Sequence, residues 1–194
     1  VGYSAAMCIL AGNEIGNFNV VKVMTYYRVC LFMALVITVL QMSVLYFAEN
    51  GFIKMYTNMD SVAFYIRAAW PVLILFTFFD TTQAMGMSVI RASGKQSVGA
   101  IITGVAYFAI GVPVSYTLAF KHSLDNAGLW WGPTLAVAFN TICYNAIIFT
   151  MDWKAVMQGI LDRKTRDERL RQEVAAQTAP AEDDDNYVQP NEIN

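Results

Sequence analysis

Charge is scarce in this sequence, and long stretches lack it almost entirely. Only 14% of the 194 residues are charged, well below the roughly 25% that is typical of soluble domains. Four stretches of at least 20 residues hold no charge or a single one, and they lie between Arg28 and Glu49, Arg67 and Arg91, Lys95 and Lys121, and Asp125 and Asp152. A helix needs about 20 apolar residues to cross a bilayer, so each stretch is long enough to do so. The pattern excludes an ordinary soluble domain.

Cysteine and histidine are rare as well. Cys8, Cys30 and Cys143 are scattered through apolar segments, and the only histidine, His122, lies in a short polar loop. They show no metal-ligand or disulfide spacing. We therefore expect no metal site. No cofactor and no enzyme activity are expected for this protein either. The positive residues flank apolar stretches and form no basic patch, which argues against a nucleic-acid partner.

The apolar stretches predict an all-α fold, a polytopic transmembrane helical bundle. Residues 1–11 are interpreted as the last turns of a helix whose beginning is missing, so we expect a fragment of a longer protein. Gly12 and Asn13 begin a turn-rich connector that extends to Asn19. Full spans are predicted at residues 23–48, 62–90, 98–120 and 129–151.

Loops and bends are predicted between and within these spans. A loop is expected over residues 49–61, around Gly51. Pro71 and Pro113 should kink or bend the spans that contain them, because proline cannot donate a helical hydrogen bond.

The composition changes beyond the last span. Residues 1–153 form the predicted transmembrane region, and residues 154–178 are dense in charge. We expect a short amphipathic helix there, lying along the cytoplasmic membrane face. Residues 179–194 are acidic and contain Pro180 and Pro190, so a disordered tail is predicted.

The positive residues predict the orientation. If the spans alternate in direction, one side holds only Lys54, Arg67 and Lys121. The side with more positive charge should be cytoplasmic, and the C-terminus lies there. Its ten residues are Lys22, Arg28, Arg91, Lys95, Lys154, Arg163, Lys164, Arg166, Arg169 and Arg171.

Asp80 is the only acidic residue inside a predicted span, and it lies near the middle of the bilayer. An ionised carboxylate costs several kcal/mol in hydrocarbon, so burial favours its protonated form and a cavity or partner is expected beside it. Such a group can exchange a proton for a cation. Thr77, Thr81 and Gln83 lie within about one turn of it and are candidate site residues. The alternative is an aspartate that only joins neighbouring helices by hydrogen bonds.

Four motifs resemble one family of transporters. The residues from Asp80 to Ala100 resemble the eukaryotic pattern of an acid, a Gln and then Gly-Val-x-Arg-Gly-Ser-Gly-x-Gln-x-x-Gly-Ala of the multidrug and toxic compound extrusion (MATE) family. Ala92 departs from this pattern, and Asn17-Phe18 stands where relatives have Ala-Gly. The other three motifs are Gly12-Asn13-Glu14-Ile15-Gly16, Tyr107 with Gly111-Val112-Pro113, and Gly128-Leu129-Trp130-Trp131-Gly132.

The resemblance covers residues 1–160 and implies both a fold and a function. The family has twelve helices in two lobes, so the chain would hold the end of the eighth helix and helices nine to twelve, without the N-terminal lobe. The implied function is export of organic cations or xenobiotics in exchange for protons, with Na⁺ as the alternative ion. Asp80 would carry the coupling. The remaining motif residues are expected to be structural: Gly12, Asn13, Arg91, Gly94, Gln96, Gly111, Pro113, Gly128 and Trp130.

Two other functions remain open. The first is a lipid-linked saccharide flippase of the same superfamily, although such proteins tend to line their cavity with arginine and no span here has one at mid-membrane. The second is a membrane scaffold without transport. For the antiporter, the expected partners are a small-molecule substrate, the lipid bilayer and the missing N-terminal lobe, in the plasma membrane or in an endomembrane such as the vacuole.

Overall fold

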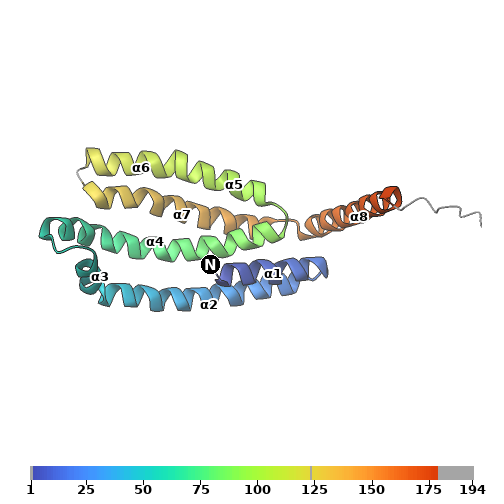
Figure 1. Ribbon diagram of the computed structural model, residues 1–194, viewed down its shortest axis with the longest axis horizontal. Coiled ribbons are helices and arrows are strands. Elements are labelled where there is room, and N and C mark those ends of the chain that lie inside the picture. The colour runs from blue at the N-terminus through green and yellow to red at the C-terminus, as the bar shows by residue number, and fades with distance from the viewer. Residues whose placement is uncertain (1, 123, 179–194) are drawn as a thin grey trace, which may run out of the picture.

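The computed structural model describes residues 2–122 and 124–178, and all regular structure in these residues is helical (Figure 1). This confirms the predicted all-α class. The predicted disordered tail lies outside the described residues. In chain order the elements are α1 (Gly2–Gly16), α2 (Val20–Phe47), α3 (Glu49–Tyr56), α4 (Asp60–Ala92), α5 (Gln96–Val105), the π-helical η1 (Ala106–Gly111), α6 (Val112–Tyr116), the π-helical η2 (Thr117–Lys121), α7 (Asp125–Thr150) and α8 (Trp153–Thr178).

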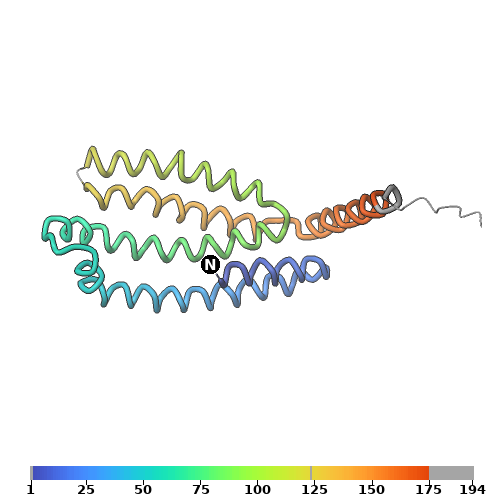
Figure 2. The backbone as a smooth tube through the Cα atoms, in the orientation of Figure 1, coloured from blue at the N-terminus to red at the C-terminus, as the bar shows by residue number. Residues whose placement is uncertain are grey.

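Four of these helical rods are long and apolar enough to cross a membrane, as predicted. They are Val20–Phe47, Asp60–Ala92, Gln96–Lys121 and Asp125–Thr150, and the third is made of α5, η1, α6 and η2 in one unbroken course (Figure 2). At 1.5 Å per residue the shortest, 26 residues, measures about 39 Å, more than the roughly 30 Å of hydrocarbon. Their outer faces carry large exposed apolar side chains, such as Leu40 and Ile142, which suits contact with lipid.

The rods lie side by side in the order α2, α4, α7 and the α5–η2 rod (Figure 1). α4 packs on both α2 and α7 and is the central element. α1 covers one half of the α2–α4 pair, and the main core lies at this end of the bundle. Met7, Tyr27, Met85 and Tyr144 are fully buried there, and Val156 of α8 joins the same cluster. The first turns of α8 are therefore part of the bundle.

Polar side chains join the rods. Tyr27 Oη of α2 donates a hydrogen bond to Asn145 Oδ1 of α7, at 2.8 Å. Trp70 Nε1 of α4 donates to the carbonyl oxygen of Leu45 at 3.1 Å, near the other end of α2. The rods are thus held together at two levels.

The turn predicted at residues 12–19 is wrong in extent. Gly12 and Asn13 lie inside α1, and only residues 17–19 connect the helices, because Ile15 is still buried in the core and keeps the chain helical. Asn19 is the N-cap of α2, and its Oδ1 accepts a hydrogen bond from the Lys22 backbone N–H at 3.1 Å.

The predicted loop at residues 49–61 contains a helix, α3. Glu49 lies in its first turn and Lys54 in its last, which matches the helix dipole, and Ile53 is buried. The helix expected at residues 154–178 corresponds to α8, which runs for 26 residues from Trp153 to Thr178. Figure 1 shows α8 extending outward from the end of the bundle and not across its face.

The expected irregularity at Pro113 is present. Pro113 lies in α6, between the π-helical turns η1 and η2. Proline removes a backbone donor, and π-turns are a common way for a helix to absorb such a break. Pro71 lies inside α4, and a further proline inside a span, Pro133 in α7, was not singled out from the sequence.

Candidate functional site

Asp80 is part of a hydrogen-bonded chain that joins α4 to α7. Asp80 Oδ1 accepts a hydrogen bond from Gln83 Nε2 at 3.0 Å, which is the contact that residues three apart on a helix make easily. Gln83 Oε1 in turn accepts from Asn140 Nδ2 at 3.0 Å. Asn140 is fully buried. Its amide therefore fixes the orientation of Gln83, which then presents its N–H group to the carboxylate.

η1 brings a third element to this chain. The Tyr107 hydroxyl interacts with the side chain of Gln83 and lies within electrostatic reach of Asp80. Asp80 was expected to be buried, but its side chain is exposed within the described residues. The carboxylate lies on an exposed face of α4 near Tyr107 of η1. Its hydrogen-bond partner Gln83 also contacts the buried Asn140 of α7.

Thr77 and Thr81 are not brought to the carboxylate. Thr77 Oγ1 donates to the carbonyl oxygen of Leu73, and Thr81 Oγ1 donates to that of Thr77, each at 3.0 Å. Thr81 is also buried. Both hydroxyl groups are hydrogen-bonded to backbone carbonyl oxygens of α4 itself. Of the four candidate residues, the structure therefore joins only Asp80 and Gln83.

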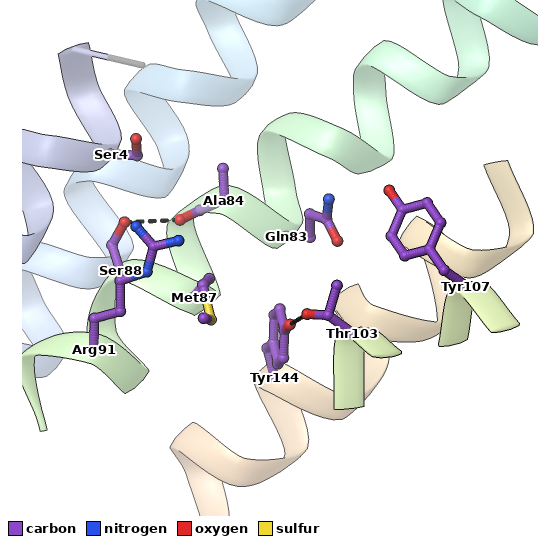
Figure 3. A pocket seen from close by; sticks show the side chains of 9 residues that line it. All are labelled: Ser4, Gln83, Ala84, Met87, Ser88, Arg91, Thr103, Tyr107 and Tyr144. Carbon is purple, nitrogen blue, oxygen red and sulfur yellow. Dashed lines mark hydrogen bonds between the residues drawn. The ribbon is translucent and has the colours of Figure 1, made fainter. Parts of the chain in front are cut away.

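A polar cavity of about 260 Å³ extends from Gln83 to Arg91, which lies in the last turn of α4 (Figure 3). The Tyr144 and Thr103 hydroxyl oxygens lie 2.5 Å apart, and Tyr144 Oη also donates to the carbonyl oxygen of Gly99 at 3.1 Å. The lining residues come from α1, α4, α5, η1 and α7, and they are Ser4, Gln83, Ala84, Met87, Ser88, Arg91, Thr103, Tyr107 and Tyr144.

An apolar groove of about 460 Å³ lies on the other side of Tyr107. Tyr107 lines both spaces and separates the polar cavity from the groove. The groove runs between the α5–η2 rod and α7, and its other lining residues are Phe108, Gly111, Val112, Ser115, Tyr116, Phe120, Leu129 and Pro133.

Several family-motif residues lie at close helix contacts. A Cβ atom on Gly128 would come within 2.5 Å of the Ala119 backbone nitrogen, so α7 and η2 require a glycine there. Gly111 is buried against α7, where a Cβ atom would meet the carbonyl oxygen of Gly132 at 3.5 Å. The Trp130 ring meets Phe76 of α4 edge-on, with ring centroids 6.0 Å apart.

Other motif residues lie at helix ends or on exposed surface. Gly94 has φ +74° between α4 and α5, a conformation that favours glycine, and a Cβ atom there would lie 3.0 Å from Arg163 Nη1 of α8. Arg91 is in the last turn of α4 and reaches into the polar cavity. Gly12, Asn13, Gln96 and Pro113 are exposed within the described residues.

Asn140, Thr103 and Tyr144 were not recognised as site residues from the sequence. A signal was present on α7, where Asn140 and Tyr144 are four residues apart and therefore share a helix face inside a span. Polar residues on one face of a membrane helix indicate contact with a neighbouring helix or a cavity. In the described part of the chain, no three His, Cys, Asp or Glu side chains come together to hold a metal ion.

Comparisons with known proteins agree with this architecture. The MatE family model matches residues 1–117. Protein DETOXIFICATION 41 of Arabidopsis thaliana is 30% identical over 176 residues, which are 90% of this chain and 34% of that protein. Multidrug and toxin extrusion protein 1 of Homo sapiens is 24% identical over 157 residues, covering 81% of this chain and 28% of that protein. The chain thus spans about a third of the length of these relatives.

A solved structure shares the fold. The crystal structure of the eukaryotic MATE transporter AtDTX14 superposes with a TM-score of 0.77 at 25% sequence identity, over 83% of this chain and 36% of that one. Protein DETOXIFICATION 14 of Arabidopsis thaliana is 28% identical over 168 residues, 84% of this chain and 34% of that protein. The match of the family model to more than half of the chain, together with the four spans, shows that this is an integral multi-pass membrane protein that belongs to the MatE family.

Proposed function

We propose that the protein is a secondary active antiporter that exports organic cations or other xenobiotics in exchange for protons, with Asp80 as the coupling group. The observation that carries the proposal is the hydrogen-bonded series Asp80–Gln83–Asn140, which holds in a defined place the one acidic residue that lies away from the ends of the four spans. Membership of a family whose relatives are named multidrug and toxin extrusion proteins supports the transport activity.

The proposed coupling follows from the charge of Asp80. When the carboxyl group is ionised, it accepts the Gln83 N–H bond and attracts a cation. When it is protonated, that attraction disappears and the bound cation is released. If the two protonation states favour opposite-facing conformations, proton entry from the outer or acidic side drives substrate out by a shift of population.

The surroundings of Asp80 favour a proton over Na⁺ as the coupling ion. A bound Na⁺ needs several oxygen ligands, as hard cations do. Gln83 presents a donor N–H to the carboxylate, while its own oxygen is already used by Asn140. A proton requires no such ligand shell.

The apolar groove supports an aromatic or lipophilic cation as substrate. Tyr107, Phe108, Tyr116 and Phe120 line the groove, and aromatic faces attract organic cations that are poorly hydrated. Within the described residues the groove carries no acidic side chain, so the charge of such a substrate would be met by Asp80 on the other side of Tyr107.

We further propose that the C-terminus and α8 lie in the cytoplasm. The side of the membrane that holds α8 has ten Lys and Arg residues, whereas the opposite side has three, and the side richer in positive charge is expected to be cytoplasmic. The Arg91 end of the polar cavity then faces the cytoplasm, on the same side as α8.

The test is transport by the intact protein in vesicles. We expect Asp80→Asn to lower uptake of a fluorescent organic cation driven by a pH gradient at least tenfold, because the amide cannot be charged. Asp60→Asn is the matched control, since Asp60 is an exposed acid in the first turn of the same helix. Unchanged pH-driven uptake with Asp80→Asn would overturn the coupling role, and a scaffold would show no substrate uptake with any variant.

A further inference from the structure

The polar cavity of Figure 3 leads from the site to one end of the bundle, and seven of its nine lining residues carry a polar side chain. It begins at Gln83, which is hydrogen-bonded to Asp80, and ends at Arg91 in the last turn of α4. Asp80 and Arg91 are 11 residues apart on one helix, so the path is about 16 Å long at 1.5 Å per residue. We propose that this cavity is the water-filled path along which protons travel between Asp80 and the α8 side of the membrane. The inference rests on the proposed function.

The chemistry of the lining suits a proton path. With about 30 Å³ for each water molecule, 260 Å³ offers room for about eight waters. The hydroxyl groups of Thr103 and Tyr144 are hydrogen-bonded to each other and to the carbonyl oxygen of Gly99, and the Tyr107 hydroxyl interacts with Gln83. Each of these oxygens keeps a lone pair that can accept a hydrogen bond from water, so they can hold a row of waters in place while the waters themselves pass the proton.

The inner end of the path also favours water. Asn140 Oδ1 is buried and, within the described residues, has no hydrogen-bond partner. A buried acceptor without a donor costs about 1–3 kcal/mol, and a water molecule beside it would remove this cost. Asn140 is hydrogen-bonded to Gln83, so this water would lie next to the residue that contacts Asp80.

The opposite side of Tyr107 does not offer such a path. The groove there is lined by apolar and aromatic side chains, apart from Ser115 and the tyrosine hydroxyls. The Ser115 hydroxyl already donates to the carbonyl oxygen of Leu129 at 2.9 Å. Of the two spaces that meet at Tyr107, only the one toward Arg91 is polar, so a hydrated route along the bundle runs toward the α8 side of the membrane.

Arg91 stands at the outer end of the path. Its side chain points toward Ser88 and Ser4 in Figure 3, and it makes no ion pair with any other described residue. Tyr107, Tyr144 and Arg91 are the titratable groups that line the cavity.

The proton transfer itself needs no other reactant. The O–H bond of protonated Asp80 breaks, its electron pair stays on the carboxylate, and the proton passes to the nearest water. Each water takes one proton and gives another to its neighbour, and a hydronium ion leaves at Arg91. Nothing is oxidised or reduced in this sequence.

The test separates proton movement from substrate movement in vesicles that carry the intact protein. Ala84 lines the cavity, so Ala84→Leu fills part of it with apolar volume. Counterflow, in which labelled substrate exchanges with unlabelled substrate, requires no net proton transfer. We expect Ala84→Leu to slow substrate-driven proton movement, followed with a pH-sensitive dye, at least tenfold while counterflow changes less than threefold. The matched control, Ala109→Leu, lies on an exposed position of η1, and both rates should stay near the wild-type values.

Two further variants keep the test decisive if Ala84→Leu is not found in the membrane. Thr103→Val keeps the shape of the side chain and removes its hydroxyl, and Tyr144→Phe does the same on α7. At least one of them should slow proton movement more than counterflow. If proton movement and counterflow fall together, or if neither falls, the proposed path is wrong. If the path variants are silent while Asp80→Asn still abolishes pH-driven uptake, the proposed function stands without this path.

Discussion

Gly128 lies where α7 comes closest to the backbone of η2. A Cβ atom at this position would be 2.5 Å from the Ala119 nitrogen, 2.7 Å from the Ala119 Cα and 2.7 Å from the Leu118 carbonyl carbon. All three are backbone atoms, which cannot turn away as the end of a side chain can. Restoring ordinary contacts would move the two rods apart by about 1 Å, as expected for a close glycine-mediated helix contact.

The expected cost of Gly128→Ala follows from two opposing effects. Overpacking of this kind costs about 3 kcal/mol, at the upper end of its usual range, because the rods have to separate. Replacing glycine by alanine inside a helix recovers about 1 kcal/mol of helix propensity. We therefore expect Gly128→Ala to lower the free energy of unfolding by about 2 kcal/mol.

Gly104 provides the matched control on the neighbouring rod. It is a helical glycine of α5, and a Cβ atom built on it meets nothing within 4 Å. Gly104→Ala should therefore keep the gain of about 1 kcal/mol without the clash. The same chemical change is expected to have opposite signs at the two positions.

The assay is denaturant or thermal unfolding of the intact protein in detergent micelles, followed by tryptophan fluorescence. Trp130 and Trp131 lie two and three residues after Gly128, so they report directly on the α7–η2 contact. If Gly128→Ala were as stable as the wild type, the close approach of these two backbones would be refuted. A loss of stability with Gly104→Ala would show that helix propensity is not the governing effect at that position.

Two other substitutions test the packing. Phe18 has φ +57° and is 52% exposed. Because asparagine tolerates the left-handed region better, Phe18→Asn should raise the free energy of unfolding by about 1 kcal/mol. A fall in the unfolding midpoint would contradict this. The Tyr27–Asn145 hydrogen bond joins α2 to α7 at 2.8 Å, and a double-mutant cycle with Tyr27→Phe and Asn145→Leu should give a coupling of about 0.6 kcal/mol. Strictly additive effects would show that this bond does not contribute.

The sequence predicted the number and the approximate places of the spans. Each predicted span lies within a few residues of an observed rod, because a stretch of at least 20 residues with at most one charge has few alternatives to a membrane helix. The ends were less predictable. Gly12 and Asn13 resemble turn residues, yet they are helical because α1 continues to Ile15, which is buried against α2 and α4.

The candidate site was predicted only in part. Asp80 and Gln83 were selected by their position, and the structure joins them. Thr77 and Thr81 were selected by the same rule, but their hydroxyl groups bond to their own helix. Helical spacing gives the neighbours of a residue, whereas the direction of a threonine hydroxyl depends on which backbone carbonyl is within reach.

The sequence by itself determined that four segments are suited to cross a membrane. Hydrocarbon offers no water to bond the backbone N–H and C=O groups, so a long apolar segment there has to be helical. Only the tertiary structure decided which polar side chains meet. Asn140 reaches Gln83 across 57 residues of sequence, and the cavity is lined by side chains from four rods or helices of the bundle. Such meetings depend on how the rods are rotated against one another, and this rotation is set by close contacts such as the one at Gly128, which no local pattern of residues specifies.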